Sequence, residues 1–191
     1  MAIPGYRGAV RPKHRLRSLI VISIVVVATV FAGNWAWNTA KHYGLVGPIQ
    51  VPSQYRALVL DAAQRCPAIS PEILAAQLVN ESHWDPKATS PAGAQGIAQF
   101  MPDVWNQVGI DANDDGRVSI WDPEDAIPSA AEFNCLNRKL VKGVSGNRLK
   151  NTLAAYNAGH GAVRKYDGIP PYPETENYVT AIIEDSKNIS W

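Results

Sequence analysis

The sequence predicts a mainly α-helical protein with an N-terminal transmembrane helix. Helix start and stop signals recur along the chain beyond residue 70, and long alternating strand patterns are absent there. The expected helices cover residues 71–82, 103–108, 125–141, 147–158 and 174–187, and clusters of proline and glycine separate them. About 140 residues follow the N-terminal segment, which is enough for one compact core. Any strand pair should be small and lie within residues 81–99.

A basic N-terminus followed by a long uncharged segment predicts export across a membrane. Residues 1–17 carry five positive charges and no acidic residue. Residues 18–37 carry no charge and contain Trp35 and Trp37 near their outer end, as expected at a membrane interface. We interpret these segments as a cytoplasmic tail and a single-pass anchor in the cytoplasmic membrane. The strongly apolar stretch 19–32 is short, so a cleaved signal segment with secretion is the alternative.

Beyond the anchor, residues 38–52 are expected to be a linker, and residues 53–191 one domain outside the cytoplasm. Residues 18–191 carry 13 basic and 17 acidic side chains, a net charge of −4. No nucleic-acid partner is expected for this domain.

The first predicted helix of the domain carries the main candidate for catalysis, Glu81. Ser70 is suited to cap the helix, and Pro71 is suited to its first position. Leu74, Leu78 and Glu81 follow the spacing of one helix face, so the carboxyl group continues an apolar stripe. Burial without a cationic partner raises the pKa of a carboxyl group, which is what a general acid requires near neutral pH. The alternative is an ordinary surface or capping glutamate.

The two cysteines, Cys66 and Cys135, are predicted to form a disulfide. An even number of cysteines in an exported domain favours a bridge over free thiols. The alternative is two buried thiols. The bridge would tie the region just before the 71–82 helix to the 125–141 helix.

Residues 111–122 match the pattern of an EF-hand calcium loop. Asp111, Asn113 and Asp115 would supply side-chain oxygens, Arg117 its backbone carbonyl, and Asp122 the last carboxylate. Aspartate replaces the usual glutamate at this last position. Its shorter side chain is expected to weaken the binding of Ca²⁺ or to favour the smaller Mg²⁺. We expect a structural ion, Ca²⁺ or Mg²⁺, and the alternative is a metal-free loop of Asx turns. The four histidines show no paired zinc-ligand spacing.

Several separated motifs resemble those of one family, in the expected order. The first runs from Glu81-Ser82 through Ser90, Gly93-Ala94, Gly96 and Gln99 to Met101-Pro102. The others are Ala154-Ala155-Tyr156-Asn157-Ala158-Gly159, and Tyr172-Pro173-Glu174-Thr175 with Tyr178-Val179. Over residues 66–183 the chain resembles the lytic transglycosylases with a soluble-lytic-transglycosylase (SLT) domain. The resemblance implies a lysozyme-like catalytic domain, and some members of the family carry an EF-hand-like insertion.

This resemblance implies roles for individual residues. Glu81 corresponds to the catalytic acid. The residues expected to bind substrate are Ser82, Ser90, Gln99, Met101, Tyr156, Asn157 and Tyr178, and Tyr178 is also expected to bond to Glu81. The sequence departs from the family pattern at Ala98 and at His83-Trp84, which puts the shape of the glycan subsites in doubt.

The expected substrate is peptidoglycan, cleaved at the β-1,4 bond between N-acetylmuramic acid and N-acetylglucosamine. The motifs offer no second catalytic carboxylate, which a hydrolase normally needs. The resemblance therefore implies that the substrate's 2-acetamido group assists and that a 1,6-anhydromuramoyl end forms, without a catalytic cofactor. The alternatives are a lysozyme-type muramidase acting on the same bond and a catalytically silent, glycan-binding cell-wall scaffold.

Overall fold

The computed structural model describes residues 47–191. The predicted tail, the membrane span 18–37 and most of the linker 38–52 lie outside the described residues. Residues Pro48–Trp191 form one compact unit, so this domain begins a few residues before the predicted boundary at residue 53. Within the described part of the chain, no helix has both the length and the apolar character needed to cross a membrane.

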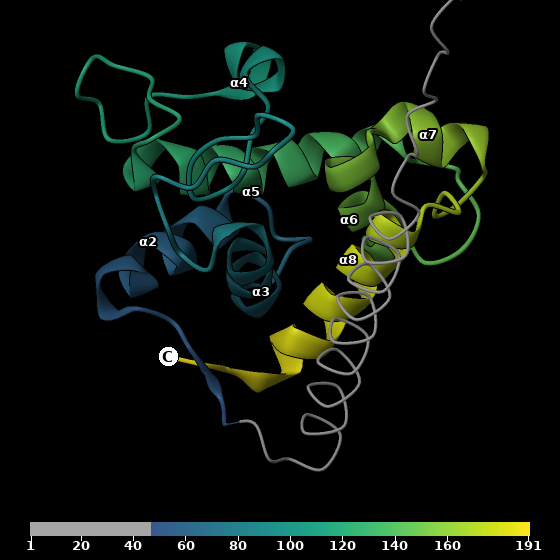
Figure 1. Cartoon of the computed structure of the whole chain (residues 1–191), viewed down its shortest axis with the longest axis horizontal. Coiled ribbons are helices and arrows are strands. Elements are labelled where there is room, and N and C mark those ends of the chain that lie inside the picture. The colour runs from purple at the N-terminus through teal and green to yellow at the C-terminus, as the bar shows by residue number, and fades with distance from the viewer. Residues whose placement is uncertain (1–46) are drawn as a thin grey trace, which may run out of the picture. The chain divides into compact units, whose positions relative to one another are not determined.

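The domain is mainly helical, as predicted (Figure 1). Four of its helices begin with proline, whose missing N–H costs nothing in the first turn. The helix at residues 71–82 has the predicted bounds, and the other four predicted helices are displaced by at most two residues at each end. In chain order the helices are α2 (Ser53–Gln64), α3 (Pro71–Ser82), α4 (Pro102–Val108), α5 (Pro123–Leu140), α6 (Arg148–Ala158), α7 (His160–Lys165), α8 (Pro173–Asp185) and the 3-10 helix η1 (Ser186–Asn188).

A two-stranded parallel sheet joins the two ends of the domain. Strand β1 (Ile49–Gln50) pairs with β2 (Ile189–Ser190), with Ile49 opposite Ile189. The last residues of the predicted linker therefore pair with the C-terminal strand of the domain. In the region predicted to hold a strand pair, residues 81–99, the structure has only the isolated antiparallel bridge Thr89 to Gln95, and a second bridge joins Gln95 to Phe100 just beyond it.

Helix α3 lies at the centre of the domain and is packed by α2 and α8 (Figure 1). Every residue from Ile73 to Leu78 is buried, including the polar side chain of Gln77. Leu74 and Leu78 are fully buried, as the apolar stripe predicted. Burying an aliphatic side chain of this size contributes roughly 1.5–3 kcal/mol, so α3 is firmly held. A functional group at the end of α3 is therefore attached to a helix that is anchored in the core.

The predicted disulfide between Cys66 and Cys135 is confirmed. Cys66 follows the end of α2, Cys135 lies within α5, and their Cα atoms are 5.5 Å apart. Beside it, Arg65 and Glu132 form an exposed ion pair at 2.8 Å. The bridge joins the segment that leads into α3 to α5, a helix of 18 residues, and so helps to fix where α3 begins.

Candidate active site

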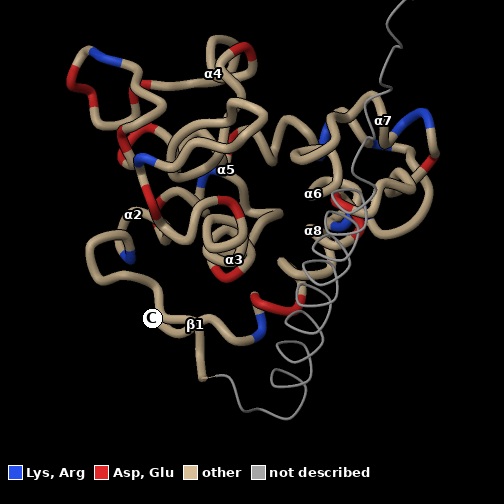
Figure 2. The backbone as a smooth tube through the Cα atoms, in the orientation of Figure 1, with Lys and Arg blue, Asp and Glu red and all other residues tan. Residues whose placement is uncertain are grey.

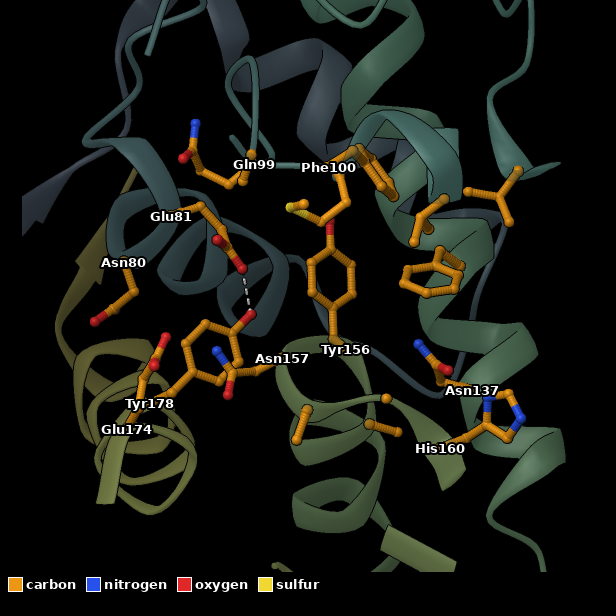
Figure 3. A pocket seen from close by; sticks show the side chains of 18 of the residues that line it. Asn80, Glu81, Gln99, Phe100, Asn137, Tyr156, Asn157, His160, Glu174 and Tyr178 are labelled. Atoms are coloured by element: carbon orange, nitrogen blue, oxygen red, sulfur yellow. Dashed lines mark hydrogen bonds between the residues drawn. The ribbon is translucent and has the colours of Figure 1, made fainter. Parts of the chain in front are cut away.

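A cleft of about 1040 Å³ opens along one side of the domain, where α3, α4, α5, α6 and α8 meet. Seven of the eight residues predicted to be catalytic or substrate-binding line it, although they come from three separate motifs (Figure 3). They are Glu81, Ser90, Gln99, Met101, Tyr156, Asn157 and Tyr178. A cleft of this size is at the upper end of the range for ligand sites and is large enough for an extended substrate.

Glu81 lies in the last turn of α3, with its carboxyl group directed into the cleft (Figure 3). The helix begins at the Ser70 cap, whose hydroxyl accepts the Ile73 N–H at 3.3 Å, and ends at His83 in the left-handed region with a φ of 53°. These two caps set the length of α3 and thereby the position of Glu81. The hydroxyl of Tyr178 donates a hydrogen bond to Glu81 Oε1 at 2.5 Å.

Burial raises the pKa of Glu81 from its ordinary value of 4.5 to about 8. The hydrogen bond from Tyr178 opposes this change because it stabilises the ionised carboxylate, and the negative charge of Glu174 reinforces it. The loss of hydration is the largest of the three causes. Glu81 is therefore protonated at neutral pH and can give its proton to a ligand in the cleft.

Tyr156 lines the cleft between Tyr178 on one side and Asn137 and His160 on the other (Figure 3). Its hydroxyl donates to the carbonyl oxygen of Ala98 at 2.9 Å, and its ring packs against Phe133 with ring centroids 5.1 Å apart. Burial, and secondarily the charge of Glu81, raise the pKa of Tyr156 well above its ordinary value. The hydroxyl therefore stays neutral, and its oxygen can accept a hydrogen bond from a ligand.

Asn157 and Gln99 each have part of their amide group held by the protein. Asn157 Oδ1 accepts the hydroxyl of Thr175 at 2.7 Å, which leaves the amide NH₂ to act as a donor. Gln99 Nε2 donates to the carbonyl oxygens of Gly96 and Ala88 at 2.8 and 3.1 Å, which leaves Oε1 as an acceptor. Asn157 thus offers a donor to the cleft and Gln99 an acceptor. In each amide, the group bonded to the protein fixes the orientation of the group that is left.

The glycine-rich segment between Ser90 and Met101 forms the edge of the cleft. Ser90 Oγ accepts the N–H of Ala94 at 3.0 Å and closes the turn, and Met101 is 42% exposed. Gly96 has a φ of 75°, and a Cβ atom there would stand 2.0 Å from the carbonyl oxygen of Ile120. Only glycine fits this approach, which fixes the segment against the loop that follows α4.

Ser82 is the one predicted binding residue that does not line the cleft. Its hydroxyl donates to the carbonyl oxygen of Ile97 at 2.8 Å, so it joins the end of α3 to the glycine-rich segment. Trp84, whose role the sequence left open, stacks on Tyr55 with ring centroids 5.8 Å apart and packs against the core. The role of Ser82 in substrate binding stays a prediction, and in the structure its side chain holds the glycine-rich segment against the end of α3.

Several residues that line the cleft were not predicted. Asn80 and Glu174 lie beside Glu81 and Tyr178, whereas Asn137 and His160 lie at the far end (Figure 3). Glu174 was detectable, because it stands in a quoted motif four residues before Tyr178, on the same helical face. Asn137 and His160 belong to no recognised functional pattern, and only the packing of α5 and of α7 against α6 brings them to the cleft.

The predicted cation loop, residues 111–122, leads from α4 into α5, and its acidic residues appear at the edge of the domain in Figure 2. The N–H of Asp115 donates both to Asp111 Oδ1 and to Asn113 Oδ1, each at 3.1 Å. Asp111 Oδ2 accepts the N–H of Gly116 at 2.9 Å. Within residues 47–191, no group of three or more His, Cys, Asp or Glu side chains is arranged to hold a metal ion.

The expected ligand Asp122 has a structural partner, because it caps α5 with Oδ1 accepting the N–H of Glu124 at 2.9 Å. At Arg117, whose backbone carbonyl was the expected ligand, the N–H donates to Asp115 at 2.8 Å. Asp125, which was not predicted, is buried and accepts the N–H groups of Ala112 and Ser119, both at 2.9 Å. It ties both arms of the loop to α5. The oxygen donors suit a hard cation, but these bonds hold the loop closed in the way expected of Asx turns.

The known proteins to which this chain is similar are transglycosylases. Residues 59–179 match the family described as transglycosylase SLT domain. Membrane-bound lytic murein transglycosylase F of Maricaulis maris (strain MCS10) is 38% identical over 109 residues, which is 56% of this chain and 22% of that protein. Membrane-bound lytic murein transglycosylase B of Escherichia coli (strain K12) is 48% identical over 42 residues, 22% of this chain and 12% of that protein. The chain spans about a fifth or less of these relatives' length.

Solved structures share the fold. The 70 kDa soluble lytic transglycosylase from Escherichia coli superposes with a TM-score of 0.53 at 27% identity, covering 66% of this chain and 23% of that chain. A complex of the 70 kDa soluble lytic transglycosylase with bulgecin A gives a TM-score of 0.53 at 28% identity, covering 65% and 23%. The predicted lysozyme-like helical domain thus has solved counterparts.

Proposed function

The chain belongs to the transglycosylase SLT domain family, and on this premise we propose that it is a lytic transglycosylase that cleaves peptidoglycan. The bond cleaved is the β-1,4 bond between N-acetylmuramic acid and N-acetylglucosamine. The observation that carries this proposal is the buried Glu81 carboxyl group, which faces a cleft of about 1040 Å³, accepts a hydrogen bond from Tyr178 and has its pKa raised by burial to about 8. A buried carboxylic acid of this kind matches the need to protonate the leaving oxygen of a glycosidic bond.

The proposed reaction uses Glu81 twice. Its proton goes to the leaving oxygen of the N-acetylglucosamine unit while the acetamido oxygen of the muramoyl unit assists at the anomeric carbon. The resulting Glu81 carboxylate then takes the proton of the muramoyl 6-hydroxyl, whose oxygen bonds to the anomeric carbon. The product is a 1,6-anhydromuramoyl end, Glu81 regains its proton, and no water is consumed.

The neighbouring residues supply orientation and charge stabilisation. The Tyr178 hydroxyl stabilises the Glu81 carboxylate that forms after the first proton transfer. We assign the Asn157 NH₂, the Gln99 Oε1 and the Tyr156 hydroxyl oxygen to hydrogen bonds with the sugar. Each of these side chains already makes a hydrogen bond to the protein, and the named group remains available to a ligand. Ser90 and Met101 are assigned to the substrate-facing edge.

A second candidate function, a muramidase that hydrolyses the same bond, is favoured by one specific observation. Glu174 lines the same cleft, and its charge acts on Glu81. A second carboxylate is the group that a hydrolase uses to activate water or to attack the sugar. Asp85, the other nearby carboxylate in sequence, accepts the N–H of Lys87 at 2.8 Å in an exposed turn and does not line the cleft.

Product analysis of purified peptidoglycan, digested with the full-length chain, separates these functions. We expect anhydromuramoyl ends from the wild type and from Glu174→Gln, and none from Glu81→Gln that retains its circular dichroism spectrum. Reducing muramic ends that disappear in Glu174→Gln would replace the proposal by the muramidase. Glycan binding without any product from the wild type would leave a cell-wall scaffold.

We also propose that the chain is held at the cytoplasmic membrane by residues 18–37, with the domain outside the cytoplasm. The relatives from Maricaulis maris and Escherichia coli bear the name membrane-bound, and the basic N-terminal segment fits the orientation rule. Extraction of the full-length chain from membranes tests this. The account requires detergent for release and protease access from the outer side, whereas release by salt or as a shortened soluble form supports secretion.

Finally, we propose that loop 111–122 binds Ca²⁺, or Mg²⁺, in a structural role. Asp111, Asn113 and Asp115 present oxygens that converge on one turn, and a carboxylate oxygen that accepts an N–H retains a lone pair for a cation. The melting temperature of the full-length chain should rise with CaCl₂ and fall with a chelator. Asp111→Asn combined with Asp115→Asn should abolish that response, and an equal response in this variant would show that the ion binds elsewhere.

A further inference from the structure

A continuous line of hydrogen bonds connects the core of the domain to Glu81. Asn134 on α5 donates through Nδ2 to Gln77 Oε1 on α3 at 2.7 Å. Gln77 donates through Nε2 to the hydroxyl oxygen of Tyr178 on α8 at 3.0 Å, and Tyr178 donates to Glu81 Oε1 at 2.5 Å. The first two members are only 0% and 1% exposed, so water does not compete for these bonds.

The presence of two amides in this position is not explained by packing alone. Gln77 lies between Ala76 and Leu78 in a helix whose neighbouring side chains are apolar and buried. A buried amide costs roughly 1–3 kcal/mol when it lacks a partner, and an apolar side chain fills such a position without that risk. An amide is useful here because one group carries both a donor and an acceptor. When its oxygen accepts a bond on one side, its NH₂ donates on the other, so the orientation of one hydrogen bond sets that of the next.

The direction of the line has a chemical consequence. Because the Asn134 donor faces Gln77 Oε1, the NH₂ group of Gln77 is directed at Tyr178. The Tyr178 oxygen accepts this bond, so its single hydrogen is left for Glu81. If the Tyr178 hydrogen faced Gln77 instead, the proton of Glu81 would be drawn to the Tyr178 oxygen and away from the cleft.

We propose that Gln77 and Asn134 are positioning residues that orient the Tyr178 hydroxyl toward Glu81 and keep the proton of Glu81 available for the substrate. This proposal deepens the proposed function. The orientation of the Tyr178 hydroxyl can be tested by itself, and only its effect on catalysis rests on the proposed function. Neither residue lines the cleft, and Gln77 acts through its hydrogen bond to Tyr178. Asn134 acts one step earlier, because its Nδ2 faces Gln77 Oε1, while its own Oδ1 is buried without a hydrogen-bond partner.

The electrostatics agree with this geometry. Burial is the main cause that raises the pKa of Tyr178 well above its ordinary value, whereas the bond from Gln77 lowers it and so makes the hydroxyl a better donor. The titratable groups that act on Glu81 are Tyr178 and Glu174 from α8 and Tyr156 from α6. A change confined to Gln77 or Asn134 leaves all of these in place.

The test is a titration of the Glu81 carboxyl group by carbon NMR in the full-length chain without substrate. Gln77→Met keeps the size of the side chain but removes the donor. We expect the midpoint to rise by a few tenths of a pH unit, because a neighbouring bond strengthens a hydrogen bond by roughly 10–30%. Asn134→Ala should raise it in the same direction. Gln77→Met added to Tyr178→Phe should give no further rise, because Tyr178 transmits the effect.

Asn151→Ala is the matched control. Asn151 is also a buried asparagine, 2% exposed, with one side-chain bond of 2.8 Å, but it donates to the carbonyl oxygen of Ser145 on a distant loop. This variant should leave the Glu81 midpoint at the wild-type value. If Gln77→Met fails to fold, the titration midpoint of Glu81 in Asn134→Ala, compared with that in Asn151→Ala, still tests the proposal.

Three results would overturn the inference: an unchanged midpoint in the folded Gln77 or Asn134 variant, an equal rise in Asn151→Ala, or a rise that persists without the Tyr178 hydroxyl. In the cleavage assay, the loss of activity at high pH should move upward together with the Glu81 midpoint. If the wild type forms no cleavage product, the proposed function fails while the titration remains a valid test. If products form but the midpoint does not move, the positioning role alone fails.

Discussion

Raising the pH from about 4 to 9 should destabilise the folded domain through Glu81, and Glu81→Gln should remove this effect. Between pH 4.5 and about 8 the folded protein keeps the Glu81 proton, whereas the unfolded chain has lost it. The unfolded state therefore binds fewer protons, and the free energy of unfolding falls as the pH rises through this window. Below pH 4.5 both states are protonated, and the contribution of Glu81 is constant.

The magnitude follows from the two pKa values. They differ by about 3.5 pH units, and each unit corresponds to about 1.36 kcal/mol. The side chain faces an open cleft and is only partly buried, so we expect a loss of roughly 3 to 5 kcal/mol. The neutral amide of Glu81→Gln has no proton to lose, and this variant should be more stable than the wild type at pH 9.

Urea unfolding of the full-length chain, followed by circular dichroism at intervals from pH 4 to 9, measures this directly. Glu184→Gln is the control, because Glu184 is exposed near the end of α8 and should leave the slope unchanged. Parallel pH dependence in the wild type and in Glu81→Gln would refute the reasoning, because it would mean that Glu81 ionises normally.

Three further changes test the fold around the cleft. Replacing Cys66 and Cys135 by serine should lower the free energy of unfolding by about 2 to 5 kcal/mol, since the bridge closes a long loop. Gly96→Ala should cost at least about 2 kcal/mol, because its Cβ would meet the Ile120 carbonyl oxygen at a backbone φ of 75°. Asn137→Leu should leave stability unchanged or raise it by up to about 2 kcal/mol, because both polar atoms of this amide are buried without a hydrogen-bond partner.

Denaturant unfolding also decides these cases. A serine double variant as stable as the oxidised protein would show that the bridge adds no constraint. An alanine at position 96 without effect would mean that the segment can move away from Ile120. A large loss in Asn137→Leu would show that this amide has a partner.

Local patterns carried much of the information about the site. The Ser70 cap and the proline after it indicated where α3 begins, and the spacing of apolar residues indicated that Glu81 lies on the face of the helix that points inward. The predicted export from the cytoplasm indicated that Cys66 and Cys135 form a disulfide. The other residues at the cleft came from motif resemblance, since nothing local tells a cleft tyrosine such as Tyr156 from a core tyrosine.

The missed elements lack a local signal. Helix α2 begins after Pro52 without a side-chain cap, and α7 is only six residues long. Strands β1 and β2 have two residues each and lie at opposite ends of the domain, so no periodicity reveals them. The line from Asn134 to Glu81 is also invisible in the sequence, because its bonds join residues 57, 101 and 97 positions apart.

The most direct test of the central claim is cleavage of peptidoglycan by the full-length chain in water labelled with heavy oxygen, with mass spectrometry of the new muramoyl ends. If Glu81 serves as both acid and base and the muramoyl 6-hydroxyl closes the ring, the new ends are anhydromuramoyl and carry no label. Labelled reducing ends would contradict the account, because they would show that water attacks the anomeric carbon.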